Sequence, residues 1–324
     1  IPDSGTLVLI VIALSYVAET IGLALKSRGE LHHLAPTVKP KVSFVHLREV
    51  MPFALSILSA AAMWAAISQT DRVVLSGQLS LAAYGEYAIL IAIAASISLL
   101  GAPVAAVVQP RLTRYLAAGD EQNAITIFSR SATLVSALVF GATIWLVLMG
   151  SEVILVYLGQ PSMIPEASLI LGLYSVGNAA VALSAFSYYL QYALGNLRLH
   201  LTVGLVQTLV TVPLTIFAAV TWGPLGCAAV WAVSNGVVLV IWVPYVLHTL
   251  RPTLVRPWLK GTLTPLVSAA LFGVAAFALL AQVDWSGSAW VITRIVLVGA
   301  ASMFGAVLPL WIIVRRPVVS ERPV

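Results

Sequence analysis

Asp71 and Arg72 are adjacent charged residues in a part of the sequence that is otherwise almost free of charge. No charged residue lies between Val50 and Thr70, and the next one after Arg72 is Glu86. The pair is either a structural ion pair or cap, or a functional pair at the mouth of a cavity. Adjacent residues on a helix point about 100° apart, so the two do not face one partner together. We expect Asp71 to face the helix bundle and to meet a donor on another helix.

Two more isolated charges lie in long apolar runs. Arg294 sits near the start of the last run, and Glu19 lies in the first, with no charge nearer than Lys26. The planar guanidinium stays ionised and suits a diphosphate, so Arg72 and Arg294 are candidates for holding an anionic headgroup. Snorkelling to the membrane surface explains Arg294 at least as well. Glu19 either carries a coupling ion or is a neutral or hydrated acid near the cytoplasmic face.

Amide side chains recur in the later apolar runs. Asn178, Gln191 and Gln207 are candidates for lining a substrate cavity, together with Asn235. Amides in membrane helices more often bond a neighbouring helix than a substrate, although a sugar-lined cavity would use the same chemistry. Both interpretations stay open.

The composition is that of an integral membrane protein. Hydrophobic residues make up 60% of the 324 residues and charged residues 9%, with a mean hydropathy of +1.00, whereas soluble domains carry about 25% charged residues. Cys227 is the only cysteine, which excludes a disulfide framework and a thiolate metal site. The sequence contains no phosphate-binding loop, no Asp-x-Asp pair and no zinc-protease motif, so we expect neither catalysis nor a metal or other cofactor.

Apolar runs of about 20 residues or more predict nine membrane-spanning helices. The run from 199 to 250 is too long for one helix and is interrupted by Trp222, Gly223 and Pro224, so it predicts two helices joined by a tight turn. Prolines 103, 213 and 244 fall inside spans and are expected to kink them. The predicted spans are 6–25, 50–70, 87–110, 131–151, 167–197, the two halves of 199–250, 261–283 and 295–314.

The basic residues predict the orientation of these spans. Fifteen of the 17 lysines and arginines fall in alternate connections or in the C-terminal tail, which the positive-inside rule makes cytoplasmic. The N-terminus is then outside and the C-terminus inside. The helix that starts near Val50 runs outward, which places Asp71 roughly 31 Å along it, at the outer boundary and at the end of the helix. Tyr84 and Tyr87 are expected nearby at the headgroup level.

Several short motifs give the sequence a resemblance to a known family. A span that ends in Asp71 is followed by VVLSGQLSLAAYGEYAIL, with Gly85, Glu86 and Tyr87 in a Gly-x-Tyr step, and then by a span that leads to QPRLTRYLAAGDEQNA. This resembles the start of the second half of the polysaccharide (O-antigen type) flippases. They share a superfamily with the multidrug and toxin extruders and the lipid II flippases. Pro110 and the pair Gly119 and Asp120 match the cytoplasmic connection after the second span of each half.

The resemblance implies an all-α fold of two lobes and fourteen spans, of which this chain supplies the C-terminal nine and lacks the first ones. Residues 1–28 would be the last span of the first lobe and 29–49 a cytoplasmic linker between lobes. Residues 50–250 would form the second lobe of six spans. Residues 251–324 would hold two extra spans and a cytoplasmic tail.

The function implied is a flippase in the bacterial cytoplasmic (inner) membrane. It would move polyprenyl-diphosphate-linked oligosaccharide across this membrane by alternating access, for polysaccharide and lipopolysaccharide biosynthesis. Its implied partners are that lipid-linked oligosaccharide, membrane lipids, a polysaccharide polymerase and glycosyltransferases, with no nucleic acid. A cation-coupled multidrug exporter of the same superfamily is the alternative, and a polytopic glycosyltransferase or ligase is a weaker one because the outward connections are short.

Overall fold

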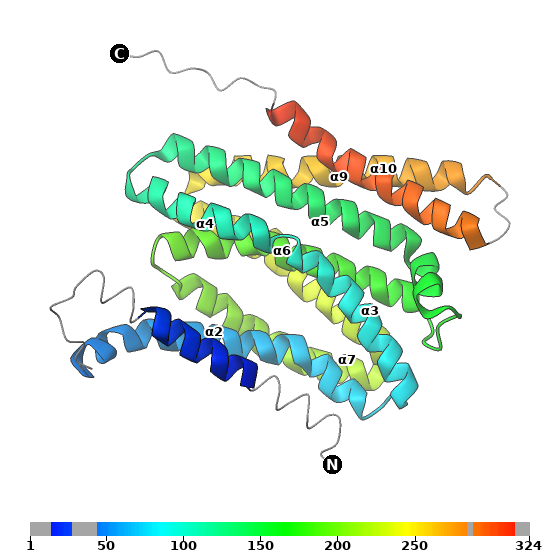
Figure 1. Ribbon diagram of the computed structural model, residues 1–324, viewed down its shortest axis with the longest axis horizontal. Coiled ribbons are helices and arrows are strands. Elements are labelled where there is room, and N and C mark those ends of the chain that lie inside the picture. Colours follow the sequence, from blue (N-terminus) through cyan, green and yellow to red (C-terminus); the bar gives the residue numbers. More distant parts are fainter. Residues whose placement is uncertain (1–13, 28–43, 284–287, 315–324) are drawn as a thin grey trace. The chain divides into compact units, whose positions relative to one another are not determined.

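The computed structural model describes residues 14–27, 44–283 and 288–314, and the regular elements in these ranges are helices (Figure 1). This confirms the all-α prediction. The chain forms two compact units, residues 1–54 and 55–324, of which the first contains helix 14–27. The remaining elements are α2 (Phe44–Ser76), α3 (Leu81–Leu99), α4 (Ala102–Ala117), α5 (Glu121–Leu158), α6 (Ala167–Ala193), α7 (Arg198–Val237), the π-helix η1 (Val238–Trp242), α8 (Val243–Leu250), the short 3₁₀ turn η2 (Pro252–Leu254), α9 (Val255–Leu280) and α10 (Ser288–Val314).

Local sequence sets several of the helix ends. The side chain of Ser80 accepts a hydrogen bond from the Ala83 N–H and caps α3, and Asp120 caps α5 in the same way through the Asn123 N–H. Gly159 ends α5 in the left-handed conformation that glycine adopts without strain. Pro103 lies in the first turn of α4 rather than inside a kinked span, because α3 has already ended at Leu99.

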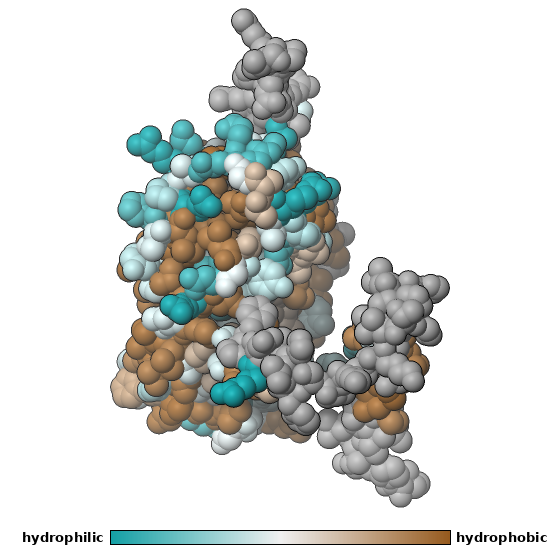
Figure 2. Space-filling model, turned by 90° about the vertical axis from the view of Figure 1, so that its left-hand side faces the viewer, coloured by the Kyte–Doolittle hydropathy of each residue, from teal (hydrophilic) through white to brown (hydrophobic). Residues whose placement is uncertain are grey.

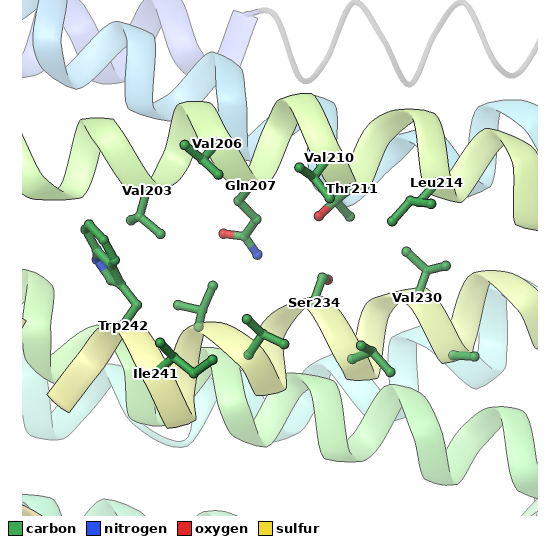
Figure 3. Close-up of a pocket in the computed structure, with 14 residues that line it drawn as sticks. Val203, Val206, Gln207, Val210, Thr211, Leu214, Val230, Ser234, Ile241 and Trp242 are labelled. Carbon is green, nitrogen blue, oxygen red and sulfur yellow. The ribbon is translucent and has the colours of Figure 1, made fainter. Parts of the chain in front are cut away.

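The expected reversal in the long run from 199 to 250 is present. Gly223 has φ 59° and ψ −144°, which breaks α7 into two arms, and Pro224 begins the second arm. A residue with a Cβ is strained at this positive φ, so glycine is required at the turn. The arms run antiparallel and face each other (Figure 3). Pro244 lies in the first turn of α8, directly after η1.

Unit 55–324 is built around α5 and α6. Helices α9 and α10 pack against each other and against α5, and α5 in turn contacts α6, which packs against α3 and α7 (Figure 1). The core contains apolar and aromatic side chains of these central helices, such as Phe128, Leu171, Leu183 and Phe186. The sequential neighbours α5 and α6 contribute the most continuous buried surface, while α7, α9 and α10 leave many apolar side chains exposed, as a membrane-spanning bundle requires.

Six helical stretches among the described residues are long and apolar enough to cross a membrane. They are 81–117, 121–158, 167–193, 198–250, 252–280 and 290–311. The fourth contains both arms of α7, so these stretches cover all the spans predicted from residue 87 onward. Helix 14–27 and α2 overlap the two earlier predicted spans. Residues 1–13, the linker residues 28–43 and the tail 315–324 lie outside the described ranges.

The α4–α5, α6–α7 and α8–α9 connections lie at one end of unit 55–324 (Figure 1). The Thr253 hydroxyl donates to Glu121 at 3.0 Å and joins two of these connections directly. Figure 2 views the molecule from this end, where groups of hydrophilic residues are interspersed among hydrophobic ones. Seven of the basic residues used to predict the cytoplasmic side lie in or beside these connections: Arg111, Arg114, Arg130, Arg198, Arg251, Arg256 and Lys260.

One predicted helix end is wrong. The helix that starts near Val50 was predicted to end at Asp71 and Arg72, but α2 continues to Ser76. The apolar residues that follow Arg72 extend the helix because Leu75 is fully buried against the bundle. Asp71 therefore lies more than one turn inside α2, where its side chain points into the bundle instead of capping the helix.

Candidate functional site

Asp71 is a buried carboxylate held by two tyrosines. Its Oδ2 accepts hydrogen bonds from the Tyr87 hydroxyl of α3 at 2.8 Å and from the Tyr174 hydroxyl of α6 at 2.6 Å. The two hydroxyl oxygens are themselves 2.6 Å apart. Oδ1 accepts from the backbone N–H of Arg72 at 2.8 Å. Asp71 thus faces the bundle and meets donors on other helices, as expected, and it ties the C-terminal part of α2 to α3 and α6.

A row of aromatic rings extends from this carboxylate. Tyr87 and Tyr174 have ring centroids 6.1 Å apart in an edge arrangement, and Tyr174 lies 6.2 Å from Trp231 of α7. Trp231 in turn lies 6.0 Å from Trp64 of α2. Gly177 makes room for this row, because a Cβ at that position would collide with the indole ring of Trp231. We call Asp71, Tyr87 and Tyr174 the carboxylate lock.

Arg72 does not pair with Asp71. Its guanidinium donates to the side-chain oxygen of Gln69 at 3.2 Å, one turn back on α2, and the residue is only partly buried. The two charged side chains therefore point to different places: Asp71 lies inside the bundle, and Arg72 lies near its surface. Tyr87, which was expected at the headgroup level, is fully buried because its hydroxyl bonds Asp71.

Glu86, next to Tyr87, fixes the connection between α5 and α6. Its Oε2 accepts from the Ser162 hydroxyl at 2.7 Å and from the Met163 N–H at 2.9 Å. The carboxylate is buried and bonded to a loop rather than to a cation among the described residues. Glu86 and Asp71 together hold the ends of α2, α3 and α6 that lie opposite the basic connections.

Two of the predicted cavity amides form their hydrogen bonds with other groups inside the bundle. Asn178 is buried and donates to the Tyr174 carbonyl at 2.8 Å on its own helix. Gln191 donates to the Ser187 carbonyl and accepts from the His200 N–H at 2.7 Å, which caps the first turn of α7. A role for either residue in binding a substrate stays a prediction.

Gln207 lies in a different setting, between the two arms of α7. Its amide nitrogen donates to the Asn235 side-chain oxygen at 3.3 Å across the arms. On one side it borders a groove of about 550 Å³ between the arms, lined mainly by valines (Figure 3). On the other side it borders a smaller cavity of about 310 Å³ between α2, α6 and α7. Figure 3 shows the Gln207 side chain directed from the first arm toward the second.

Arg294 is engaged within the C-terminal helices. It forms an ion pair with Glu152 of α5 at 3.2 Å, and its guanidinium lies over the Phe277 ring, 5.0 Å from the centroid. Both charged side chains are about one-fifth exposed. This arrangement joins α10 to α5 and α9, and a role in holding a headgroup stays a prediction.

Glu19 lies on helix 14–27, and its side chain is exposed. This helix belongs to the unit of residues 1–54, so the proposed coupling role stays a prediction as well. In the part of the chain that the structure describes, no three His, Cys, Asp or Glu residues cluster in a way that could hold a metal ion.

The partners of the candidate residues were not predicted from the sequence. Tyr174 carried no signal as a ligand of Asp71, and Glu152 was not considered as the partner of Arg294. Trp64, Tyr188 and His200, which line the smaller cavity, were not singled out as cavity residues. A partial signal existed, because polar and aromatic residues recur on the faces of α6 and α7 that meet, but only the packed structure brings them to one place.

Two comparisons relate the chain to known proteins. Residues 10–161 match the model of a family described as "polysaccharide biosynthesis protein". The fold is similar to a structure of the lipid II flippase MurJ in an inward closed conformation, with a TM-score of 0.58 and 14% sequence identity. The alignment covers 86% of this chain and 57% of that chain, so the chain spans little more than half the length of that flippase. A search of the curated proteins finds no match.

These findings confirm the resemblance drawn from the motifs. The motif-bearing region around Asp71 and the α4–α5 connection falls within the family match, and the fold similarity extends through most of the helices. The chain is a multi-pass membrane protein whose helical fold is similar to that of a lipid II flippase, and its residues 10–161 match a polysaccharide biosynthesis family.

Proposed function

We propose that the protein flips a lipid-linked oligosaccharide, carried on a polyprenyl diphosphate, across the bacterial cytoplasmic membrane. The observation that carries this proposal is the match of residues 10–161 to a polysaccharide biosynthesis family on a fold similar to that of a lipid flippase. The protein would act as a transporter and not as an enzyme, with its C-terminus in the cytoplasm. The gathering of basic connections at one end of the bundle supports this orientation.

The carboxylate lock supports a role in alternating access. Rocking of one lobe against another needs helices that are held in one arrangement and released into a second one. The contacts of Asp71 hold α2 to α3 and α6 through two hydroxyls, which are contacts of the kind that such a transition must break and reform. Arg72, partly exposed beside the lock, would offer a cation to the departing diphosphate.

A cation-coupled exporter of the same superfamily is the second candidate. It is favoured by one observation: Asp71 is a buried carboxylate that forms no ion pair among the described residues. Intramembrane acids of this kind often bind a coupling ion. Resistance to toxic cations on expression, without any effect on surface polysaccharide, would support this candidate over the first.

The experiment combines a cellular and a reconstituted assay on the full-length protein. Cells that depend on the gene for surface polysaccharide are complemented with wild type or with the double variant Asp71→Asn, Arg72→Gln, and purified proteins are tested for leaflet transfer of lipid-linked glycan into vesicles. We expect wild type to support both and the double variant, at equal expression, to lose most of the export.

A matched control removes the same two charges elsewhere. Asp120→Asn, Arg256→Gln changes residues at the end of the bundle that carries the basic connections, and asparagine preserves the helix cap. It should export normally. The proposal is abandoned if purified wild type transfers no lipid-linked glycan and deletion of the gene leaves the surface polysaccharide intact.

A further inference from the structure

A cavity lies between α2, α6 and α7. It has a volume of about 310 Å³ and is lined by residues of α2 from Ala60 to Ile67, by the second half of α6 and by both arms of α7 with η1. Ligand sites for small molecules begin at about 300 Å³. The cavity therefore has room for a small cyclic group, and not for a long lipid chain.

Its walls differ in chemistry from those of the neighbouring groove. The rings of Trp64, Tyr188, His200 and Trp242 line the cavity, together with the amides of Gln207 and Asn235. The groove between the arms of α7 shares part of this wall but is otherwise lined mainly by aliphatic side chains (Figure 3). Lipid chains suffice to fill such a groove, whereas they leave the polar groups of the cavity without partners.

Hydrogen-bonding groups are available at this wall. The rings of Tyr188 and His200 are 4.9 Å apart, and within the described residues neither the Tyr188 hydroxyl nor the His200 ring nitrogens form a hydrogen bond. Trp64 is 46% exposed and likewise keeps its indole N–H without a partner there. Polar groups that face hydrocarbon without partners are unfavourable, so this face is suited to water or a polar ligand.

We propose that this cavity binds one pyranose ring of the lipid-linked glycan, with Trp64 stacked on the apolar face of the sugar and Tyr188, His200 and Gln207 bonded to its hydroxyls. A pyranose has an apolar C–H face and a rim of hydroxyls, which corresponds to one aromatic wall and one polar wall. The proposal rests on the flippase function and adds to it the part of the substrate that this lobe recognises. Free diphosphate is a poor occupant, because the cavity is lined by no Lys or Arg.

The test measures binding to the purified full-length protein in lipid nanodiscs. Two probes are used: polyprenyl-diphosphate-linked oligosaccharide extracted from producing cells, and the same polyprenyl diphosphate without sugar. Trp64→Leu removes the stacking ring while keeping an apolar side chain. Trp222→Leu is the matched control, because Trp222 is 64% exposed at the turn of α7 and lines neither cavity nor groove.

We expect Trp64→Leu to weaken binding of the glycan-bearing lipid by about tenfold and to leave the sugar-free lipid unchanged. Trp222→Leu should change neither. Tyr188→Phe, which removes only a hydroxyl and keeps the ring, should weaken glycan binding to a smaller extent. This variant tests the proposal even if Trp64→Leu lowers the yield of folded protein.

Two results overturn the proposal. Equal loss of both probes in Trp64→Leu means that the ring supports the helices or the lipid, and unchanged binding of both probes in Trp64→Leu and Tyr188→Phe means that the cavity takes no sugar. Failure of the flippase function itself is recognised separately, because wild-type protein then binds neither lipid-linked probe.

Discussion

The strength of the carboxylate lock is open to direct measurement through Tyr174→Phe. This change removes the hydroxyl that donates to Asp71 at 2.6 Å and keeps the ring that packs on Trp231. The carboxylate keeps two donors, the Tyr87 hydroxyl at 2.8 Å and the Arg72 N–H at 2.8 Å. The loss is therefore one hydrogen bond and not a bare charge.

The expected loss of unfolding free energy follows from the kind of bond. Hydrogen bonds to charged groups contribute about 1.5–3 kcal/mol, whereas polar pairs between membrane helices average about 0.6 kcal/mol. Because the contact is short, in the range of hydrogen bonds to a carboxylate, we use the charged case and expect a loss of about 2 kcal/mol. Tyr157→Phe, at an exposed tyrosine, should stay within about 0.5 kcal/mol of wild type.

The assay is equilibrium unfolding of the purified full-length protein in mixed micelles, carried out as a double-mutant cycle. Tyr174→Phe, Asp71→Leu and the double variant are compared, so that the coupling between the two side chains is separated from the effect of each change alone. A coupling of about 2 kcal/mol supports the lock. A coupling below about 0.3 kcal/mol, the level of independent sites, would refute the reasoning.

Two further predictions concern a cap and a close contact. The side-chain amide and the backbone N–H of Asn123 donate to Asp120 and lower the pKa of its carboxyl from the ordinary value. The Asp120 carboxylate therefore stabilises the fold at pH values above the ordinary carboxyl pKa, and this stabilisation is lost as the pH falls through the lower pKa of the folded state. In thermal melts between about pH 6 and pH 2, the melting temperature should fall, and it should fall less in Asp120→Asn. Gly177→Ala should destabilise by about 1–3 kcal/mol because its Cβ collides with Trp231, whereas Gly236→Ala, which has open space, should not, as the same melts will show.

The fold was largely predictable because a membrane imposes a simple rule on the sequence. Charge-free runs of sufficient length mark the spans, and the turn at Gly223 and Pro224 stands out because both residues break a helix. The turn between α4 and α5 was likewise predicted correctly, because glycine favours turns and aspartate favours helix N-caps, as Gly119 and Asp120 do here. Each of these signals is local.

The contacts of the candidate site were less predictable because they join distant parts of the chain. Tyr87 and Tyr174 are 87 residues apart, and each lies 16 or more residues from Asp71. Charge statistics indicated that Asp71 needs a donor but not which one. The same limit applies to Arg294, whose partner Glu152 reaches it only because α10 packs against α5. The end of α2 was misplaced for a related reason, since burial of Leu75 decides it.

The polar residues of the helices fall into two groups by how their hydrogen bonds are used. Asp71 and Gln191 bond other helices and fix the arrangement of α2, α3, α6 and α7, and Asn178 bonds a carbonyl of its own helix. Tyr188 and His200 line a cavity with hydrogen-bonding groups that have no partner among the described residues. A residue of the first group affects transport by changing which arrangement is stable, and so alters stability and export together. A residue of the second group alters binding of the glycan while stability is kept, which is why the two sets of variants separate recognition from movement.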